Sequence, residues 1–307
     1  MYIALTLRDE WAQFRGTPLV VEPRWPAIVV SGAIVLLTHG LLIETWRRVL
    51  HAWGPGNALA FWDAARIWCV TNLGKYVPGK VWGIGAMGVM AQARGVSGSA
   101  AAGSAVLGTV VNIAMGFVVA LAAGWRAFDA IVRGHAAIGI VLAVAILGVL
   151  FAVPFILPRQ LTLPGTRLFS RRVDLQVFPH RAVYVAMAGN LLAWILYGIA
   201  FWVFVYGTLG VAGGTLSDYV AAYASSYVVG YLALVVPAGL GVREGALTVA
   251  LTTLGLATLP QAAVVAVTSR LWVTVLEVGP GLAFLARHQS MQPPRTQRVA
   301  EENSQLK

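Results

Sequence analysis

Six charged side chains stand within or beside apolar stretches of this sequence, where charge is rare. They are Lys75, Lys80, Arg243, Glu244, Arg270 and Glu277. An ionisable group in apolar surroundings is costly, so it usually pairs with another charge or binds a charged ligand. Four of the six are cations, and the chemistry that this set offers is the capture of an anion.

The segment Pro237–Gly245 (PAGLGVREG) places two of these charges directly after glycines. We expect Gly239 and Gly241 to let a ligand approach the backbone closely. A helix that starts at Arg243 and Glu244 presents its first N–H groups to an anion such as phosphate. Arg243 adds a charge-assisted hydrogen bond to that anion. The alternative is that Arg243 and Glu244 lie at the water surface and only cap a helix.

The segment Leu73–Lys80 (LGKYVPGK) has a similar composition. Lys75 and Lys80 flank a Pro-Gly pair that should break a helix. If this break lies at mid-membrane, a lysine there needs a partner or an anionic ligand, and we expect Lys80 to be the deeper one. The alternative is that one or both lysines extend to the membrane interface.

Arg270 and Glu277 are seven residues apart, which places them on one face of a helix. The simplest expectation is internal pairing, of Arg270 with Glu244 and of Glu277 with Arg243 or Lys80. Alternatively these charges exchange partners and gate a cavity, and Glu244 or Glu277 carries a proton. Asp63 and Arg66 are expected to pair at the surface.

The composition indicates an integral membrane protein. Of the 307 residues, 58% are hydrophobic and only 11% are charged, against about 25% charged in a soluble domain. The net charge of +10 is better explained by the Lys and Arg residues that collect in the cytoplasmic loops of membrane proteins than by nucleic-acid binding. The single cysteine and five scattered histidines provide no metal or disulfide pattern, and no catalytic motif is present. We therefore expect no enzyme activity and no cofactor.

The expected fold is all-α and polytopic, with two re-entrant helical hairpins in an inverted repeat. A membrane span needs about 20 apolar residues, and five stretches qualify: 27–46, 99–124, 136–157, 182–206 and 261–285. Between them lie two longer stretches, 58–93 and 219–257, each interrupted by a Pro-Gly-rich break. Paired breaks at corresponding positions of two halves are typical of a transporter's binding site.

The distribution of arginines predicts the orientation. The loop 158–181 carries five arginines and one aspartate, so we place it in the cytoplasm together with the C-terminal tail 287–307. Residues 27–286 form the transmembrane domain, in halves of about 27–157 and 182–286. Residues 1–26 are expected to lie on the membrane surface, and the protein is expected to be a multi-pass protein of the cytoplasmic (inner) cell membrane.

At its two broken segments the chain resembles the lysylphosphatidylglycerol synthase transmembrane (flippase) family. Pro237–Gly245 followed by Ser269-Arg270 is similar to the family signature, and Leu73–Lys80 resembles the first motif of its stand-alone members, which lack the synthase domain. The resemblance spans about residues 27–285. It implies a flippase that moves lipids between leaflets, while the lysines of the first motif favour an anionic head group.

The function expected from these observations is translocation of a lipid or lipid-linked anionic substrate across the membrane. The alternatives are a small-solute or ion transporter of the same symmetry, and a scaffold, which transports nothing, for a lipid-modifying enzyme. The expected partners are membrane lipids, a second copy of the chain or an enzyme of lipid biosynthesis, and not nucleic acid.

Overall fold

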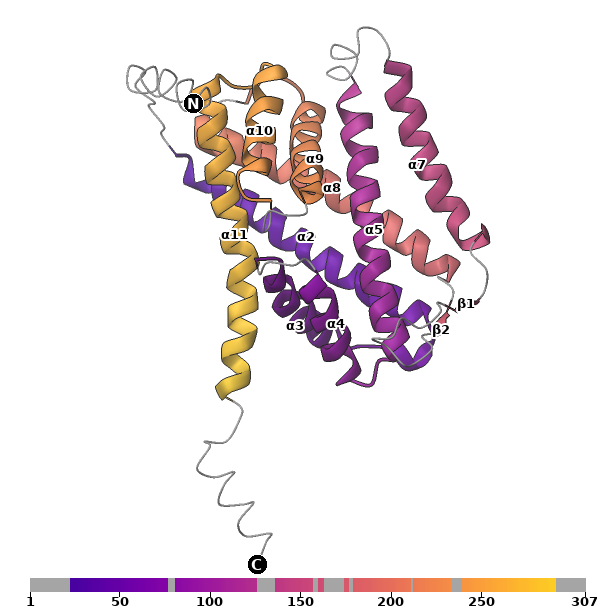
Figure 1. Cartoon of the computed structure of the whole chain (residues 1–307). Helices are drawn as coiled ribbons and strands as arrows, with labels where there is room; N and C mark the ends of the chain where they lie inside the picture. The colour runs from indigo at the N-terminus through magenta and orange to yellow at the C-terminus, as the bar shows by residue number, and fades with distance from the viewer. Residues whose placement is uncertain are drawn as a thin grey trace, which may run out of the picture.

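The computed structural model shows an all-helical protein with one short antiparallel pair of strands (Figure 1). It describes residues 23–76, 81–125, 136–156, 160–162, 174–176, 179–210, 212–233 and 239–290. Its elements are α2 (Trp25–Ala52), η1 (Pro55–Asn57), α3 (Phe61–Asn72), η2 (Leu73–Tyr76), α4 (Val81–Gln92), α5 (Gly98–Ala123), α7 (Ala136–Ile156), β1 (Gln160–Thr162), β2 (Asp174–Gln176), α8 (His180–Leu209), α9 (Leu216–Leu232), α10 (Val242–Thr253) and α11 (Leu259–Ser290).

Within the described residues, four helices are long and apolar enough to cross a membrane, namely α2, α5, α8 and α11. They confirm four of the five expected spans. The fifth corresponds to α7, whose apolar part with described side chains is Ala137–Ala152. Large apolar side chains point outward along these helices, for example Leu37 and Leu271, which are 71% and 62% exposed. An outward apolar surface of this kind is stable in lipid.

Helices α2 and α8 pack against each other in antiparallel orientation along most of their length. Small residues permit this close approach, as is common between membrane helices. Thr45 lies against Gly189, and Ile28 near one end of α2 lies against Gly207 near the opposite end of α8. The hydroxyl of Ser31 donates a hydrogen bond to the carbonyl of Ala200 at 2.8 Å, which links the two helices inside the protein.

Two pairs of helices flank the Pro-Gly-rich segments that were predicted to interrupt a helix: α3 with α4, and α9 with α10. The two pairs lie toward opposite ends of the molecule (Figure 1). Helix α3 packs against the lower half of α11 and carries α4 on its other side, and α10 packs against the upper half of α11 and carries α9. Helices α3, α4 and α10 have 12 residues each, or about 18 Å. That is shorter than the hydrocarbon thickness of about 30 Å. The breaks at Pro78 and Pro237 themselves lie outside the described residues.

The second helix of each pair ends in the same backbone motif. Gly95 and Gly255 both have a positive φ, of 84° and 66°. After each glycine comes an apolar residue, Val96 or Leu256, whose N–H donates to a carbonyl five residues earlier. This is the pattern of a glycine-terminated helix, with an apolar residue covering the end. The long helices α5 and α11 start directly afterwards.

The long helices connect the two halves of the chain. Helix α5 packs against α4 of its own half and against α8 and α9 of the other. Helix α11 likewise packs against α10 of its own half and against α2 and α3 of the other. Each broken pair is therefore held between helices of both halves. Of the expected peripheral segments, residues 1–22 and 291–307 and most of 158–181 lie outside the described residues.

Substitution of a glycine at a helix contact tests this packing. A Cβ on Gly198 of α8 would lie 2.8 Å from the Cα of Val220 on α9. We expect Gly198→Ala to lower stability by about 1–3 kcal/mol, because backbone must move to admit the methyl group. Gly148→Ala on α7 is the matched control, since nothing lies within 4 Å of its Cβ position. The thermal unfolding midpoint in detergent measures the effect, and equal midpoints for the two variants would contradict the packing.

Candidate functional site

Two ion pairs attach the broken helix pairs to α11. The Lys75 ammonium, in η2, lies 2.5 Å from a carboxylate oxygen of Glu277. Glu244, in the first turn of α10, lies 3.4 Å from Nε of Arg270. Arg270 and Glu277 are about 10 Å apart along the helix axis. The two helix pairs therefore contact α11 within two turns of each other.

The Glu277 carboxylate binds a second group besides Lys75. The Tyr76 hydroxyl donates to the same oxygen at 2.8 Å. Close packing of the backbone brings η2 to this position, because a Cβ on Gly74 would lie 3.1 Å from the Cα of Gly83 in α4. A larger residue at Gly74 would push the two arms apart and move Lys75 away from Glu277.

Arg243 is buried, only 6% exposed, and its guanidinium lies over two aromatic rings. The distances to the ring centroids are 5.0 Å for Tyr223 and 4.6 Å for Tyr227. These are cation–π distances. Within the described part of the chain, no carboxylate lies within ion-pair distance of this guanidinium. The interpretation of Arg243 as a surface helix cap is therefore wrong.

Two glycines place Arg243 against helix α9. A Cβ on Gly230 would lie 2.8 Å from Cβ of Arg243, so only glycine leaves room for the arginine there. Gly239 packs equally close, with its Cβ position 2.5 Å from the carbonyl oxygen of Gly230 and a φ of 69°. A side chain at either position would separate α10 from α9.

Glu244 occupies part of the helix terminus that we expected to bind an anion. Its carboxylate accepts a hydrogen bond from the N–H of Gly241 at 2.6 Å. Gly241 has a φ of 79° and precedes the first residue of α10. Glu244 is thus an internal cap, and the anion-binding capacity of this region rests on side chains rather than on that N–H group.

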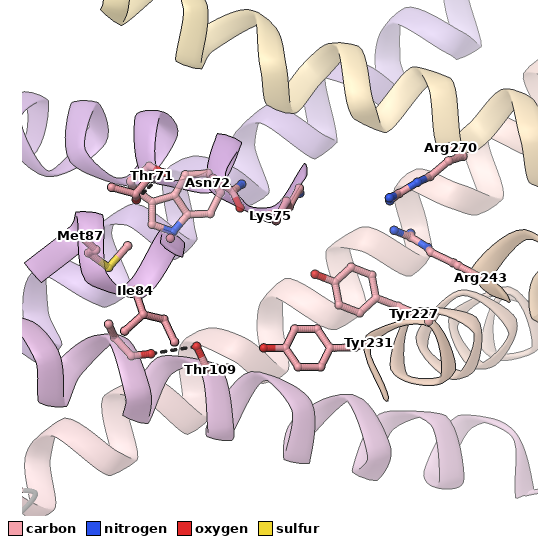
Figure 2. Close-up of a pocket in the computed structure, with 14 residues that line it drawn as sticks. Thr71, Asn72, Lys75, Ile84, Met87, Thr109, Tyr227, Tyr231, Arg243 and Arg270 are labelled. Atoms are coloured by element: carbon pink, nitrogen blue, oxygen red, sulfur yellow. Dashed lines mark hydrogen bonds between the residues drawn. The ribbon is translucent and has the colours of Figure 1, made fainter. Parts of the chain in front are cut away.

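A cavity of about 220 Å³ lies between the two broken pairs. Figure 2 shows Arg243 and Arg270 on one side of it and Lys75 on the opposite side, with the hydroxyl groups of Tyr227 and Tyr231 between them. Helices α3, α4, α5, α9, α10 and α11 all contribute to its lining. Residues from both halves of the chain therefore form one site.

The charges in and around this cavity do not cancel. Lys75, Arg243 and Arg270 provide three positive charges, and Glu244 and Glu277 provide two negative ones. Each carboxylate already contacts one cation. Among the described residues, one positive charge in excess therefore remains, and it belongs to the buried Arg243.

A second cavity, of about 250 Å³, is continuous with the first and shares eight lining residues with it, among them Asn72, Lys75, Thr109 and Tyr227. Its polar groups are mainly uncharged. The side chain of Asn112 donates to that of Asn190 at 2.8 Å, which connects α5 with α8 across this space. Each cavity approaches the lower end of the range typical of small-molecule sites, about 300–1,000 Å³.

The predicted site residues thus converge, with some corrections. Lys75, Arg243 and Arg270 line one cavity, and the expected Arg270–Glu244 pair is confirmed. Glu277 pairs with Lys75, not with Arg243, and Lys80 lies outside the described residues. Asp63 pairs with Arg94 rather than with Arg66, because Arg94 follows the neighbouring antiparallel arm α4.

Sequence reasoning missed the tyrosines of α9. Tyr223, Tyr227 and Tyr231 recur every four residues, a spacing that places them on one helix face. All three line the cavities. The described residues contain no group of three or more His, Cys, Asp or Glu side chains that could hold a metal ion.

Comparison with protein-family models, with curated proteins and with solved structures finds no match to this chain.

The Lys75–Glu277 pair can be tested by a double-mutant cycle. We expect Lys75→Met alone to lower stability by about 2 kcal/mol, because it leaves the Glu277 carboxylate without its cation. A fully buried pair costs about 3–5 kcal/mol to break, but the Lys75 side chain keeps 26% exposure to the cavity. Adding Glu277→Gln should restore much of the loss, since the amide oxygen still accepts from Tyr76.

The measurement is the unfolding midpoint of each variant in detergent. Arg48→Met is the matched control, because the Arg48 side chain is 67% exposed and its pair with Glu44 is expected to contribute only about 0–1 kcal/mol. Additive effects of the Lys75 and Glu277 substitutions would show that the two groups do not interact.

Proposed function

We propose that this protein is a membrane translocase that moves a lipid or lipid-linked anionic substrate between the two leaflets. The observation that carries the proposal is Arg243, a buried cation beside a cavity with no carboxylate within ion-pair distance among the described residues. A buried charge without an opposite charge is strongly unfavourable. An anionic head group in the cavity would supply that charge.

The substrate's phosphate would lie between Arg243, Arg270 and Lys75. An arginine can hold two oxygens of one phosphate at once, whereas a lysine acts as a point charge. These three side chains would replace the water that the head group loses when it enters the hydrocarbon region. Gly239 would support the site by permitting the close contact of α9 and α10, and Gly241, with its positive φ and open surroundings, would leave the start of α10 accessible to the substrate.

The acyl chains would stay in lipid while the head group crosses. The two faces of helices α4 and α5 favour this arrangement. On each helix one face lines the cavity, and the other exposes apolar side chains on the outer surface of the protein. On α5, Ala105 and Thr109 line the cavity, while the adjacent Val106 and Val110 are 43% and 52% exposed. The head group would thus lie on the cavity side of α5, and the acyl chains would lie on its lipid-facing side.

The two broken helix pairs would be re-entrant hairpins related by an inverted repeat. Three features support this proposal: the short arms α3, α4 and α10, the positions of the pairs beside opposite halves of α11, and the matching helix ends at Gly95 and Gly255. An inverted repeat provides two related states, one open to each side, as alternating access requires.

The orientation that we propose follows the positive-inside rule. The arginine-rich loop 158–181 and the C-terminal tail would face the cytoplasm, and the membrane would be the cytoplasmic membrane of the cell. The base of the α3–α4 pair would then face the cytoplasm, and the base of the α9–α10 pair would face the outside. Membership of the flippase family that the chain resembles is part of this proposal.

The alternatives make different demands on the site. A scaffold that transports nothing is expected to have side chains filling its centre and fully paired charges, and the two cavities and Arg243 disfavour it. A small-solute carrier would use the same cations for a soluble anion. The apolar outer surface of α4 and α5 beside the cavity favours the lipid.

Removal of Arg243 tests the proposal. In proteoliposomes containing a fluorescent anionic phospholipid, we expect Arg243→Ala to slow translocation about a hundredfold, because losing a buried charge contact typically costs about 2–5 kcal/mol. Arg48→Ala, the removal of an exposed arginine, should leave the rate unchanged. The rate is measured by dithionite bleaching of the fluorophore. A normal rate for a folded Arg243→Ala protein would exclude Arg243 from the mechanism.

Cysteine labelling tests the opposed hairpins. The only native cysteine, Cys69, is first replaced by alanine. Ala93→Cys at the base of the first pair and Ser217→Cys at the base of the second place single thiols at exposed positions. In intact cells a membrane-impermeant maleimide should label the second thiol and not the first. Labelling of both, or of neither, from the outside would refute the inverted arrangement.

A further inference from the structure

We propose that the second cavity binds an uncharged, hydroxyl-bearing group attached to the substrate's phosphate, so that the head group is a polyol phosphodiester. This inference rests on the proposed function and identifies the class of head group. The cationic cavity would hold the phosphate, and the adjoining one would hold the polyol.

The polar lining of the second cavity fits hydroxyl groups. Its uncharged polar side chains include three amides and three hydroxyls: Asn72, Asn112, Asn190, Thr45, Ser104 and Thr109. An amide both donates and accepts hydrogen bonds. A polyol also presents donors and acceptors at every carbon, so this lining can satisfy it without any charge.

The hydrogen bonds inside the protein leave part of this capacity for a ligand. Asn112 donates to Asn190, and Asn190 donates to the carbonyl of Ala186, both at 2.8 Å. Each amide has two N–H groups and one oxygen with two lone pairs, so further positions remain on both. The Thr109 hydroxyl donates to the carbonyl of Ala105 at 2.9 Å, and its oxygen can still accept.

Asn72 is the amide that most needs a ligand. It lies at the end of α3 and lines both cavities. The structure provides no hydrogen-bond partner for its side chain among the described residues. In Figure 2 it lies beside Lys75 and opposite Arg243. A ligand whose phosphate binds Arg243 would therefore bring its next group toward Asn72.

Aromatic rings complete the second cavity. Trp68, Trp194, Tyr197 and Tyr223 contribute to its lining. The Trp194 indole N–H already donates to the backbone carbonyl of Asn112 at 3.0 Å, so its ring is held in place. The C–H faces of a cyclic polyol are apolar, and aromatic rings offer a matching surface.

An amine-bearing head group fits this site poorly. The only carboxylate that lines either cavity within the described residues is Glu277. Its oxygen already contacts the Lys75 ammonium and the Tyr76 hydroxyl. A cationic amino group would compete with Lys75 for that carboxylate and would lie close to three fixed cations, Lys75, Arg243 and Arg270. The charge distribution thus selects a neutral group next to the phosphate.

The first experiment compares lipids in proteoliposomes of the full chain. The probes are acyl-chain-labelled phosphatidylinositol, phosphatidate and lysyl-phosphatidylglycerol, followed by dithionite bleaching. We expect phosphatidylinositol to move at least about tenfold faster than the other two. Phosphatidate lacks the hydroxyl groups that a site built to bond hydroxyls requires, and the amino groups of lysyl-phosphatidylglycerol would be repelled by the fixed cations. Equal rates for phosphatidylinositol and phosphatidate, or the highest rate for lysyl-phosphatidylglycerol, would overturn the inference.

Variants of the second cavity then test whether its side chains cause the preference for phosphatidylinositol over phosphatidate. Asn112→Leu should reduce the ratio of the phosphatidylinositol rate to the phosphatidate rate about tenfold, and Gln92→Leu, an amide replacement at an exposed position outside both cavities, should leave the ratio unchanged. If Asn112→Leu does not fold, Asn72→Leu decides, since that amide has no partner to lose. An unchanged ratio in a folded variant would overturn the assignment of the polyol site.

A binding measurement separates this inference from the proposed function. Purified protein in detergent is titrated with myo-inositol 1-phosphate and with inorganic phosphate by calorimetry. We expect about tenfold tighter binding of the inositol phosphate, lost in Asn112→Leu. If this preference is found but no lipid moves, the translocase proposal fails and the site serves a soluble ligand. If lipids move but neither assay shows a preference for the polyol, only the inference fails.

Discussion

The burial of one guanidinium between two helices determines how this site is built. Arg243 can reach the cavity only because α9 has a glycine, Gly230, where the two helices touch. The preceding chain must turn sharply to start α10 at that point, and Gly239 and Gly241 supply the positive φ values that the turn needs. Gly230, Gly239 and Gly241 therefore contribute to the proposed site by placing the Arg243 guanidinium beside the cavity.

Helix α11 brings the two halves of the chain to a common centre. It offers Arg270 to the carboxylate of the second pair and Glu277 to the ammonium of the first. These opposite charges, two turns apart, fix the depth to which each broken pair can extend along the helix. The same pairing neutralises both acids, so the site as a whole keeps a positive charge. Structural contacts and ligand chemistry thus depend on the same side chains.

The sequence allowed much of this architecture to be predicted, for identifiable reasons. Apolar length predicted the spans α2, α5, α8 and α11, and the seven-residue spacing of Arg270 and Glu277 predicted a common face. The partner of Glu277 was not predictable, because the short turn η2 decides which lysine approaches α11. The rings over Arg243 were also missed. Their four-residue spacing was visible, but nothing in the sequence showed which helix they would face.

In the site that we propose, the contact of Arg243 with two tyrosine rings would affect how long an anionic ligand stays bound. A carboxylate next to the guanidinium would compete with an incoming anion and would hold the side chain tightly when the site is empty. Aromatic faces attract a cation by only about 0.5–2 kcal/mol, and they carry no net charge to repel a phosphate. Tyr223 and Tyr227 would thus hold the Arg243 side chain in place in the empty site while lowering its affinity for an anion only slightly. In the translocase that we propose, weak retention of this kind would suit repeated binding and release of the substrate.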